Sequence, residues 1–247
     1  MRTLCYVSHR YRFIWILVAK NASSTLREWF AHEPCAATLH VHADLPADIR
    51  RNYFTFVFLR DPVERALSAY QEVSYRADRN PSYLPAPAFL QRPAGQERFE
   101  AFLDEAARCP WDGHVHPQAR FIKGVRIDDW GCVEHLQRDV TRILGPLGIV
   151  RVPDLPRRRS RASRAVDEGY TSHHLEQQDL AEATVRRIRD VYHDDVALYQ
   201  RYVLDAEIFR EASPACPRDR GGSAALHPRP DSNHGRASSS RRDPIVQ

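Results

Sequence analysis

The chain has 247 residues, 43% of them hydrophobic, and a formal net charge of +4 at pH 7. This length suffices for one sizeable core, so we expect a single domain. Six Arg and three Asp place +3 of the charge within residues 213–247, which argues against a nucleic-acid-binding face elsewhere. The apolar stretch Phe13 to Ala19 is far shorter than the roughly 20 residues of a membrane-spanning helix, so we expect no transmembrane segment, no export signal and a cytoplasmic location.

The first predicted unit is a strand, a tight turn and a helix. Phe13 to Ala19 is an apolar run typical of a buried strand, and apolar residues recur at helical spacing from Leu26 to Phe30. Ser23 to Thr25 are helix-capping types, and a helix N-terminus suits a phosphate because of its free N–H groups and positive dipole. Lys20, at the junction, is one of only two Lys among 36 basic residues, and its compact ammonium acts as a point charge on a phosphate.

The second predicted unit repeats this order. Asn52 to Leu59 reads as a buried strand, an Arg-Asp-Pro turn follows, and helical spacing runs from Val63 to Tyr70. Two such units predict an α/β domain with a central, mainly parallel sheet flanked by helices, as in P-loop nucleotide kinases. Arg60 ends the strand and Ser68 lies about two turns into the helix, so a ligand with two separated phosphates would use both loops.

The rest of the chain predicts helices, loops and a tail. Helical spacing resumes in three segments: 97–108, 133–144 and 175–202, the last as one helix or two. The Pro-rich segment 79–95 reads as a loop, and the basic segment 157–164 reads as a solvated loop. Pro, Gly, Ser and Arg dominate from Ser213, which predicts a folded domain over 1–212 and a disordered tail over 213–247.

These loops resemble the paired motifs of a known family. AKNASSTL at 19–26 and FVFLRDPVERALSAY at 56–70 are similar to the phosphate-binding motifs of sulfotransferases that use 3′-phosphoadenylyl sulfate. Within them the likeness is to the sulfotransferase 2 family, which includes heparan 2-O-, chondroitin and HNK-1 carbohydrate sulfotransferases. Three later segments resemble further motifs of these enzymes: HVHPQARFI at 114–122, CVEHLQRDVTRIL at 132–144 and VYHDDVALYQRY at 191–202. Val115 stands where these enzymes usually have Trp, and the resemblance covers about residues 13–203.

The resemblance implies roles for both loops. In the family the first motif binds the 5′-phosphosulfate of the donor, and the second binds the 3′-phosphate through its Arg and Ser. These roles pass to Lys20, Asn21, Ala22, Ser23, Ser24 and Thr25 in the first loop, and to Arg60 and Ser68 in the second. The implied reaction moves the sulfuryl group of 3′-phosphoadenylyl sulfate to a hydroxyl of an acceptor, a glycan or glycolipid, and requires no metal. Acceptor specificity is then expected in the loop 79–95, and the basic segment 157–164 is either a contact for an anionic acceptor or a solvated loop.

The reaction needs a cation and a base. Sulfuryl transfer, like phosphoryl transfer, builds negative charge on the leaving phosphate oxygen, and Lys20 is the expected catalytic cation there. A His is the expected general base for the acceptor hydroxyl. His40 and His42 would share one face of a strand, and we favour His42, because its segment precedes the Arg60 motif as the base-carrying segment does in heparan 2-O-sulfotransferases. His114 is the second candidate, as the base or as an acceptor contact.

Three other interpretations remain open. The two His-x-His pairs would suit a metal, but no third and fourth ligand stands at zinc-like spacing. A small-molecule kinase would share the fold, although the first loop lacks the Walker glycines. A noncatalytic nucleotide-binding protein would keep both phosphate loops and tolerate loss of the base.

Overall fold

The computed structural model describes residues 2–31, 35–79, 88–108, 112–150, 152, 154–155 and 175–205. The predicted tail over 213–247, the basic segment 157–164 and residues 80–87 of the Pro-rich loop lie outside the described residues. The other end of that loop holds a 3₁₀ turn over Ala88–Gln91.

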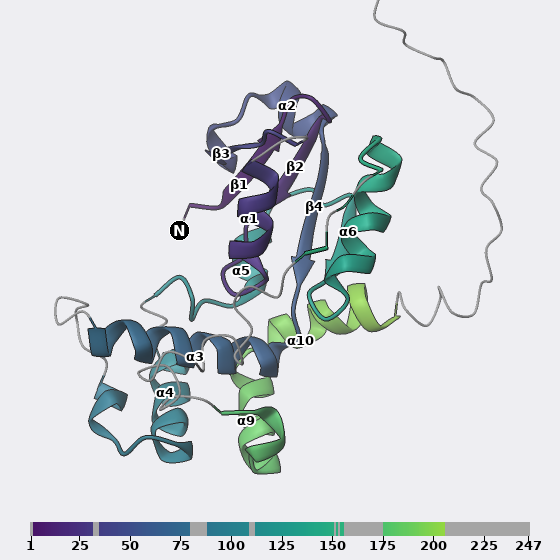
Figure 1. Cartoon of the computed structure of the whole chain (residues 1–247). Helices are drawn as coiled ribbons and strands as arrows, with labels where there is room; N and C mark the ends of the chain where they lie inside the picture. Colours follow the sequence, from purple (N-terminus) through teal and green to yellow (C-terminus); the bar gives the residue numbers. More distant parts are fainter. Residues whose placement is uncertain are drawn as a thin grey trace, which may run out of the picture. The chain divides into compact units, whose positions relative to one another are not determined.

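A five-stranded sheet forms the centre, with strand order β3-β1-β2-β4-β5 (Figure 1). The strands are β1 (Leu4–Ser8), β2 (Phe13–Ile16), β3 (Thr38–Val41), β4 (Phe54–Leu59) and β5 (Asp129–Cys132). β2, β4 and β5 are parallel, whereas β1 runs antiparallel to both β2 and β3. The carboxyl ends of four strands therefore lie at one edge of the sheet. The α/β prediction is confirmed, with β1 as the strand of opposite direction.

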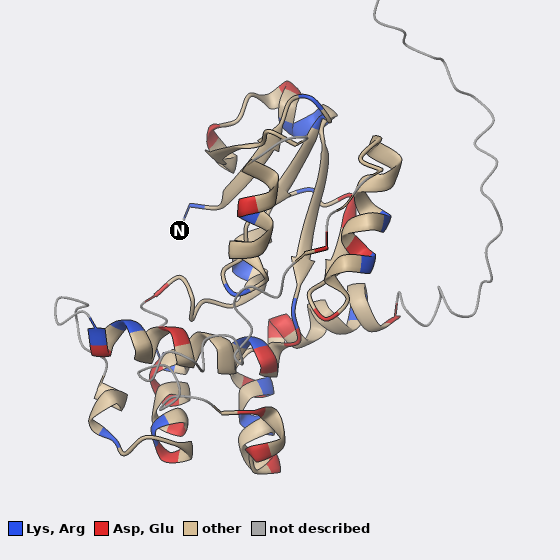
Figure 2. Ribbon diagram, in the orientation of Figure 1, with Lys and Arg blue, Asp and Glu red and all other residues tan. Residues whose placement is uncertain are grey.

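Helices cover both faces of the sheet. The main helices are α1 (Ser23–Ala31), α2 (Ala47–Asn52), α3 (Pro62–Arg79), α4 (Gln96–Arg108), α5 (Gln118–Ile122), α6 (Leu136–Leu144), α9 (Glu182–Val191) and α10 (His193–Tyr199). Shorter turns lie at His42–Asp44, Gly145–Leu147 and Gln177–Asp179, and a π-helical turn at Gln200–Leu204 follows α10. Figure 2 shows that basic and acidic residues are interspersed along these helices. No helix among the described residues is both long and apolar enough to cross a membrane.

Alternation along the strands divides the core into two layers. Phe13 and Trp15 of β2 point to the face where α1 and α6 pack, and Phe56 of β4 joins them. Ile14 and Ile16 point to the opposite face, where they pack against apolar residues of α5 and of the segment before α2. A third cluster joins α3, α4 and α9, which Figure 1 shows as a group of helices beyond the ends of the strands. Helices therefore pack on both faces of the sheet. The carboxyl ends of β2, β3, β4 and β5 form one edge, called the carboxyl edge, and α3 lies at this edge.

The structure corrects several predicted boundaries. The first strand ends at Ile16 instead of Ala19, because the chain turns there before α1. The segment 175–202 forms two helices, as one of the two predictions had it, but the first begins at Glu182 and not at Leu175. The break lies at Tyr192, whose ψ of 37° departs from helical geometry. Strands β1 and β5 were not predicted, and β3 was expected only in the interpretation that places His40 and His42 on a strand; each of the three has five residues or fewer. In β5 Gly131 is required, since a Cβ there would collide with the Phe58 ring.

Candidate functional site

The first predicted phosphate motif, Lys20 to Thr25, begins in the turn over residues 17–22 that connects β2 to α1 and continues into the first turn of α1. Lys20 has a φ of 70° and Ala22 a φ of 54°, so two residues with side chains adopt the left-handed conformation. That conformation costs roughly 1–2 kcal/mol per residue and is concentrated at ligand-binding loops. Backbone N–H groups in such a turn, together with a helix N-terminus, form an anion-binding concavity. The first turn of α1 carries no acidic residue that would fill it.

Lys20 is held at this loop by a carboxylate of α3. Its Nζ lies 3.0 Å from Oε2 of Glu72, and the two side chains are 12% and 9% exposed. The other oxygen of Glu72 accepts a hydrogen bond from Arg76 Nε at 2.8 Å. The ammonium is therefore fixed in position, and its charge is balanced by Glu72.

The second predicted phosphate loop touches the first. Arg60 follows the last residue of β4, and its Nη1 donates to the backbone oxygen of Lys20 at 3.2 Å. Its Nη2 lies 3.3 Å from Oε2 of Glu64, again a carboxylate of α3. The structure thus brings together Lys20 and Arg60, which are 40 residues apart in the sequence.

Ser68 lies between these two cations on α3. Residues four and eight positions apart share one face of a helix, so Glu64, Ser68 and Glu72 form a row along α3. Glu64 meets Arg60 at one end of the row, and Glu72 meets Lys20 at the other. Ser68, which is largely buried, is therefore in the row that faces both loops.

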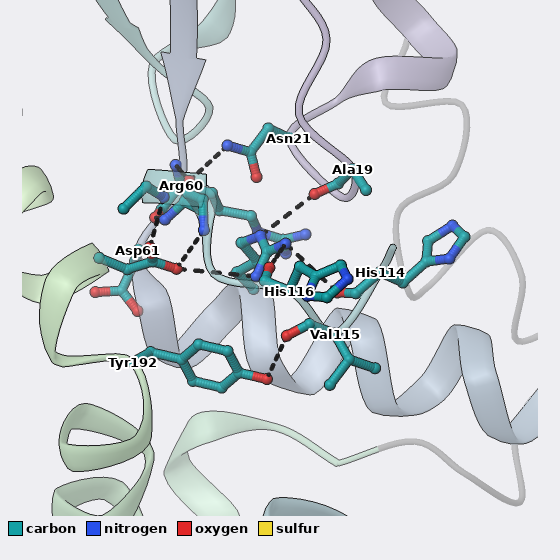
Figure 3. A network of polar contacts seen from close by, with 12 residues as sticks. Ala19, Asn21, Arg60, Asp61, His114, Val115, His116 and Tyr192 are labelled. Carbon is teal, nitrogen blue, oxygen red and sulfur yellow. Dashed lines mark hydrogen bonds and ion pairs between the residues drawn. The ribbon is translucent and has the colours of Figure 1, made fainter. Parts of the chain in front are cut away.

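A third segment, residues 112–118, is attached to the first loop and to α10 by the buried guanidinium of Arg65 (Figure 3). Arg65 Nε donates to the backbone oxygen of Ala19 at 3.3 Å, and Nη2 donates to the backbone oxygens of His116 at 2.6 Å and His114 at 3.4 Å. Arg65 Nη1 lies 3.9 Å from Asp195 of α10, and both side chains are 1% exposed. Burial lowers the pKa of Arg65, while the Asp195 carboxylate opposes that effect.

His42 lies at the same edge of the sheet but further along it. Strand β3 ends at Val41, so His40 and His42 do not share a strand face, and His42 instead opens a 3₁₀ turn. Val41 pairs with Leu4, which in turn accepts a hydrogen bond from the backbone N–H of Leu17 at 2.9 Å. Strand β1 lies between β3 and β2. The backbone of His42, which follows β3, is therefore two strand spacings, roughly 10 Å, from the backbone that follows β2 and starts the first loop. Burial, and to a lesser degree Arg50, lowers its pKa.

His114 is oriented by a neighbouring carboxylate. Its Nδ1 lies 2.5 Å from Oδ1 of Asp112, and the same oxygen accepts the backbone N–H of His114 at 2.7 Å. The ring is thereby fixed with Nδ1 toward Asp112, the arrangement by which a carboxylate orients a general base. Arg65 holds the backbone of the same residue. Both candidate bases therefore belong to segments at the carboxyl edge.

Several residues of this site were not predicted from the sequence as site residues. They are Arg65, Glu72, Asp112, Gln118, Tyr192 and Asp195. The segments that carry the family resemblance contain four of these residues, Arg65, Gln118, Tyr192 and Asp195. Membership of those segments was the sequence feature that could have identified them as site residues. Nothing in the local sequence distinguishes Arg65 from the other 33 Arg of the chain, so its buried position is seen only in the folded structure. Among the described residues no group of three or more His, Cys, Asp or Glu is placed to hold a metal ion.

Comparison with known proteins agrees with this geometry. Residues 1–203 match the sulfotransferase family. A search of curated proteins found no match, and neither did a search of solved structures. Since the match covers most of the chain, and includes both phosphate-type loops and the segments attached to them, the chain belongs to the sulfotransferase family and is a transferase.

Proposed function

We propose that this chain transfers the sulfuryl group of 3′-phosphoadenylyl sulfate to a hydroxyl of a carbohydrate or glycolipid acceptor. The observation that carries the proposal is the contact between the two loops, in which Arg60 donates to the backbone of Lys20 at 3.2 Å. Two cation-bearing anion sites side by side suit a nucleotide with separate 5′ and 3′ phosphates. A kinase for small molecules would need only the first site.

The residues present fit such a donor. The first loop offers Lys20, the hydroxyls of Ser23, Ser24 and Thr25, and the N–H groups that begin α1 for the 5′-phosphosulfate. Asn21 and Ala22 shape this loop through a buried amide and a left-handed backbone. Arg60 and Ser68 are proposed to bind the 3′-phosphate.

In the proposed mechanism the protein supplies a cation and a base. Lys20 meets the negative charge that develops on the leaving phosphate oxygen, so its effect is larger in the transition state than in the ground state. His42 takes the proton of the attacking hydroxyl, and its lowered pKa keeps the imidazole neutral at pH 7. His114, fixed by Asp112, is the alternative base or an acceptor contact. The proposal requires no metal.

The test combines binding with transfer. By calorimetry the chain should bind adenosine 3′,5′-bisphosphate far more tightly than AMP, because Arg60 and Ser68 face a 3′-phosphate only in the former. Labelled 3′-phosphoadenylyl sulfate, incubated with a panel of glycans and lipids, should transfer its label in the wild type and not in Lys20→Ala. Equal affinity for the two nucleotides would refute the donor assignment.

The alternatives predict different outcomes of the same experiment. ATP turnover with magnesium would favour the kinase, and intact binding without any transfer would favour a noncatalytic protein. The two base candidates are separated by His42→Ala and His114→Ala. If only His114→Ala abolishes transfer, the base is His114, and if both variants retain full transfer, neither His is the base.

A further inference from the structure

We infer that Gln118 is a positioning residue that sets the spacing between the two phosphate sites, so that the gain from binding both phosphates together depends on its side-chain amide. The inference rests on the proposed function and adds a residue to it. Gln118 is the first residue of α5, and its side chain is completely buried. It is placed to act through the two loops and not by contact with the reacting atoms.

The amide of Gln118 holds both loops at once. Its Nε2 donates to the backbone oxygen of Arg60 at 2.9 Å, and its Oε1 accepts the backbone N–H of Arg60 at 3.0 Å. The same Oε1 accepts from Nδ2 of Asn21 at 2.5 Å, and this Nδ2 also donates to the backbone oxygen of Phe58 at 2.8 Å. One side-chain amide therefore satisfies the backbone N–H and C=O of Arg60 in the second loop and also accepts a hydrogen bond from the Asn21 side chain in the first loop.

The amide is itself held in place by α10. Oδ2 of Asp195 accepts the backbone N–H of Gln118 at 2.8 Å, and Oδ1 accepts that of Ala119 at 2.9 Å. Asp195 is balanced by Arg65, whose Nε also donates to the backbone oxygen of Ala19 in the first loop. Gln118, Asn21, Arg65 and Asp195 are each at most 1% exposed, so water cannot replace these bonds when one is lost.

No other side chain of this length supplies the same set of bonds. An amide both donates and accepts, as the N–H and C=O of Arg60 together require. Asn keeps a neutral amide but is one methylene shorter, so it cannot reach Arg60 and Asn21 together. Met would fill the same space and satisfy none of these groups. The two substitutions therefore relax the link between the loops to different degrees.

Calorimetry with three nucleotides tests the inference. The dissociation constants of AMP, adenosine 3′-phosphate and adenosine 3′,5′-bisphosphate are measured for the wild type, Gln118→Met and Gln118→Asn, which both keep the charge unchanged. We expect each monophosphate to bind the variants within about threefold of the wild type, whereas the bisphosphate weakens at least about tenfold in Gln118→Met and less in Gln118→Asn. Gln178→Met, at an exposed position, is the matched control and should bind all three as the wild type does.

Each outcome has one meaning. A bisphosphate gain that persists in both Gln118 variants overturns this inference and leaves the proposed function standing. An equal weakening of all three nucleotides also overturns it, since it shows a general structural role. If Gln118→Met melts below the assay temperature, Gln118→Asn, which keeps the amide, decides the question alone. A wild type that gains nothing from the second phosphate would overturn the proposed function, and this inference with it.

Discussion

The ion pair between Lys20 and Glu72 should compete with the donor, so we expect Glu72→Gln to bind adenosine 3′,5′-bisphosphate about tenfold more tightly than the wild type. Glu72 Oε2 lies 3.0 Å from Lys20 Nζ. A phosphate that takes the same ammonium would stand beside a carboxylate. The amide of Gln can still accept a hydrogen bond from Nζ, so the substitution removes the negative charge and keeps the lysine in place.

The magnitude follows from the geometry. Two anions that share one ammonium at about 3 Å each lie roughly 5 Å apart, and at an effective dielectric constant of 20 their repulsion is about 3 kcal/mol. Burial leaves little solvent screening, since the two side chains are 12% and 9% exposed. Arg76, at 2.8 Å from the other oxygen of Glu72, offsets part of this repulsion. About half of the repulsion, near 1.4 kcal/mol, corresponds to the tenfold change.

Calorimetry with single-phosphate nucleotides locates the effect. Glu72→Gln should tighten binding of AMP, whereas Glu64→Gln, which frees Arg60, should tighten binding of adenosine 3′-phosphate. Glu97→Gln changes the same charge at a position that is 62% exposed on α4, and it should alter neither affinity. Weaker or unchanged bisphosphate binding in Glu72→Gln would refute the competition between Glu72 and the donor.

Three further predictions test the catalytic groups and the sheet. Lys20→Ala should weaken donor binding modestly and lower turnover much more. Lys20→Arg should restore little turnover, because a planar guanidinium does not place its charge where the ammonium was, and steady-state kinetics of both variants separate the effect on turnover from the effect on binding. Burial and Arg50 lower the pKa of His42 from its ordinary value of 6.5, so the rate should fall only as the pH drops through a value below 6.5, and Arg50→Gln should move this limb of the pH–rate profile to higher pH. Gly131→Ala should lower the free energy of unfolding by about 1–3 kcal/mol in urea, because its Cβ meets the Phe58 ring, and an unchanged midpoint would show that the ring can move.

Local sequence determined the two strand–loop–helix units and the residues that bear their charges. Apolar runs, helical spacing and capping residues act over a few positions, so β2 with α1 and β4 with α3 could be predicted. Lys20 was visible because Lys is rare in this chain, and Arg60 because it ends an apolar strand. The resemblance then linked these two units to three later segments of the chain. The family match over residues 1–203 confirms the assignment to the sulfotransferase family.

Only the tertiary structure decided how these parts meet. Gln118 contacts Asn21 across 97 residues and Arg60 across 58, and such contacts follow from which strands are neighbours, which no local pattern specifies. The same holds for Glu72, 52 residues from Lys20, which in the sequence is one more acidic residue on a helix. His42 comes to the carboxyl edge because β3 pairs with β1, a short strand that the apolar pattern does not distinguish. Burial and long-range pairing therefore determine the positioning of the site, whereas local propensity determines the elements that carry it.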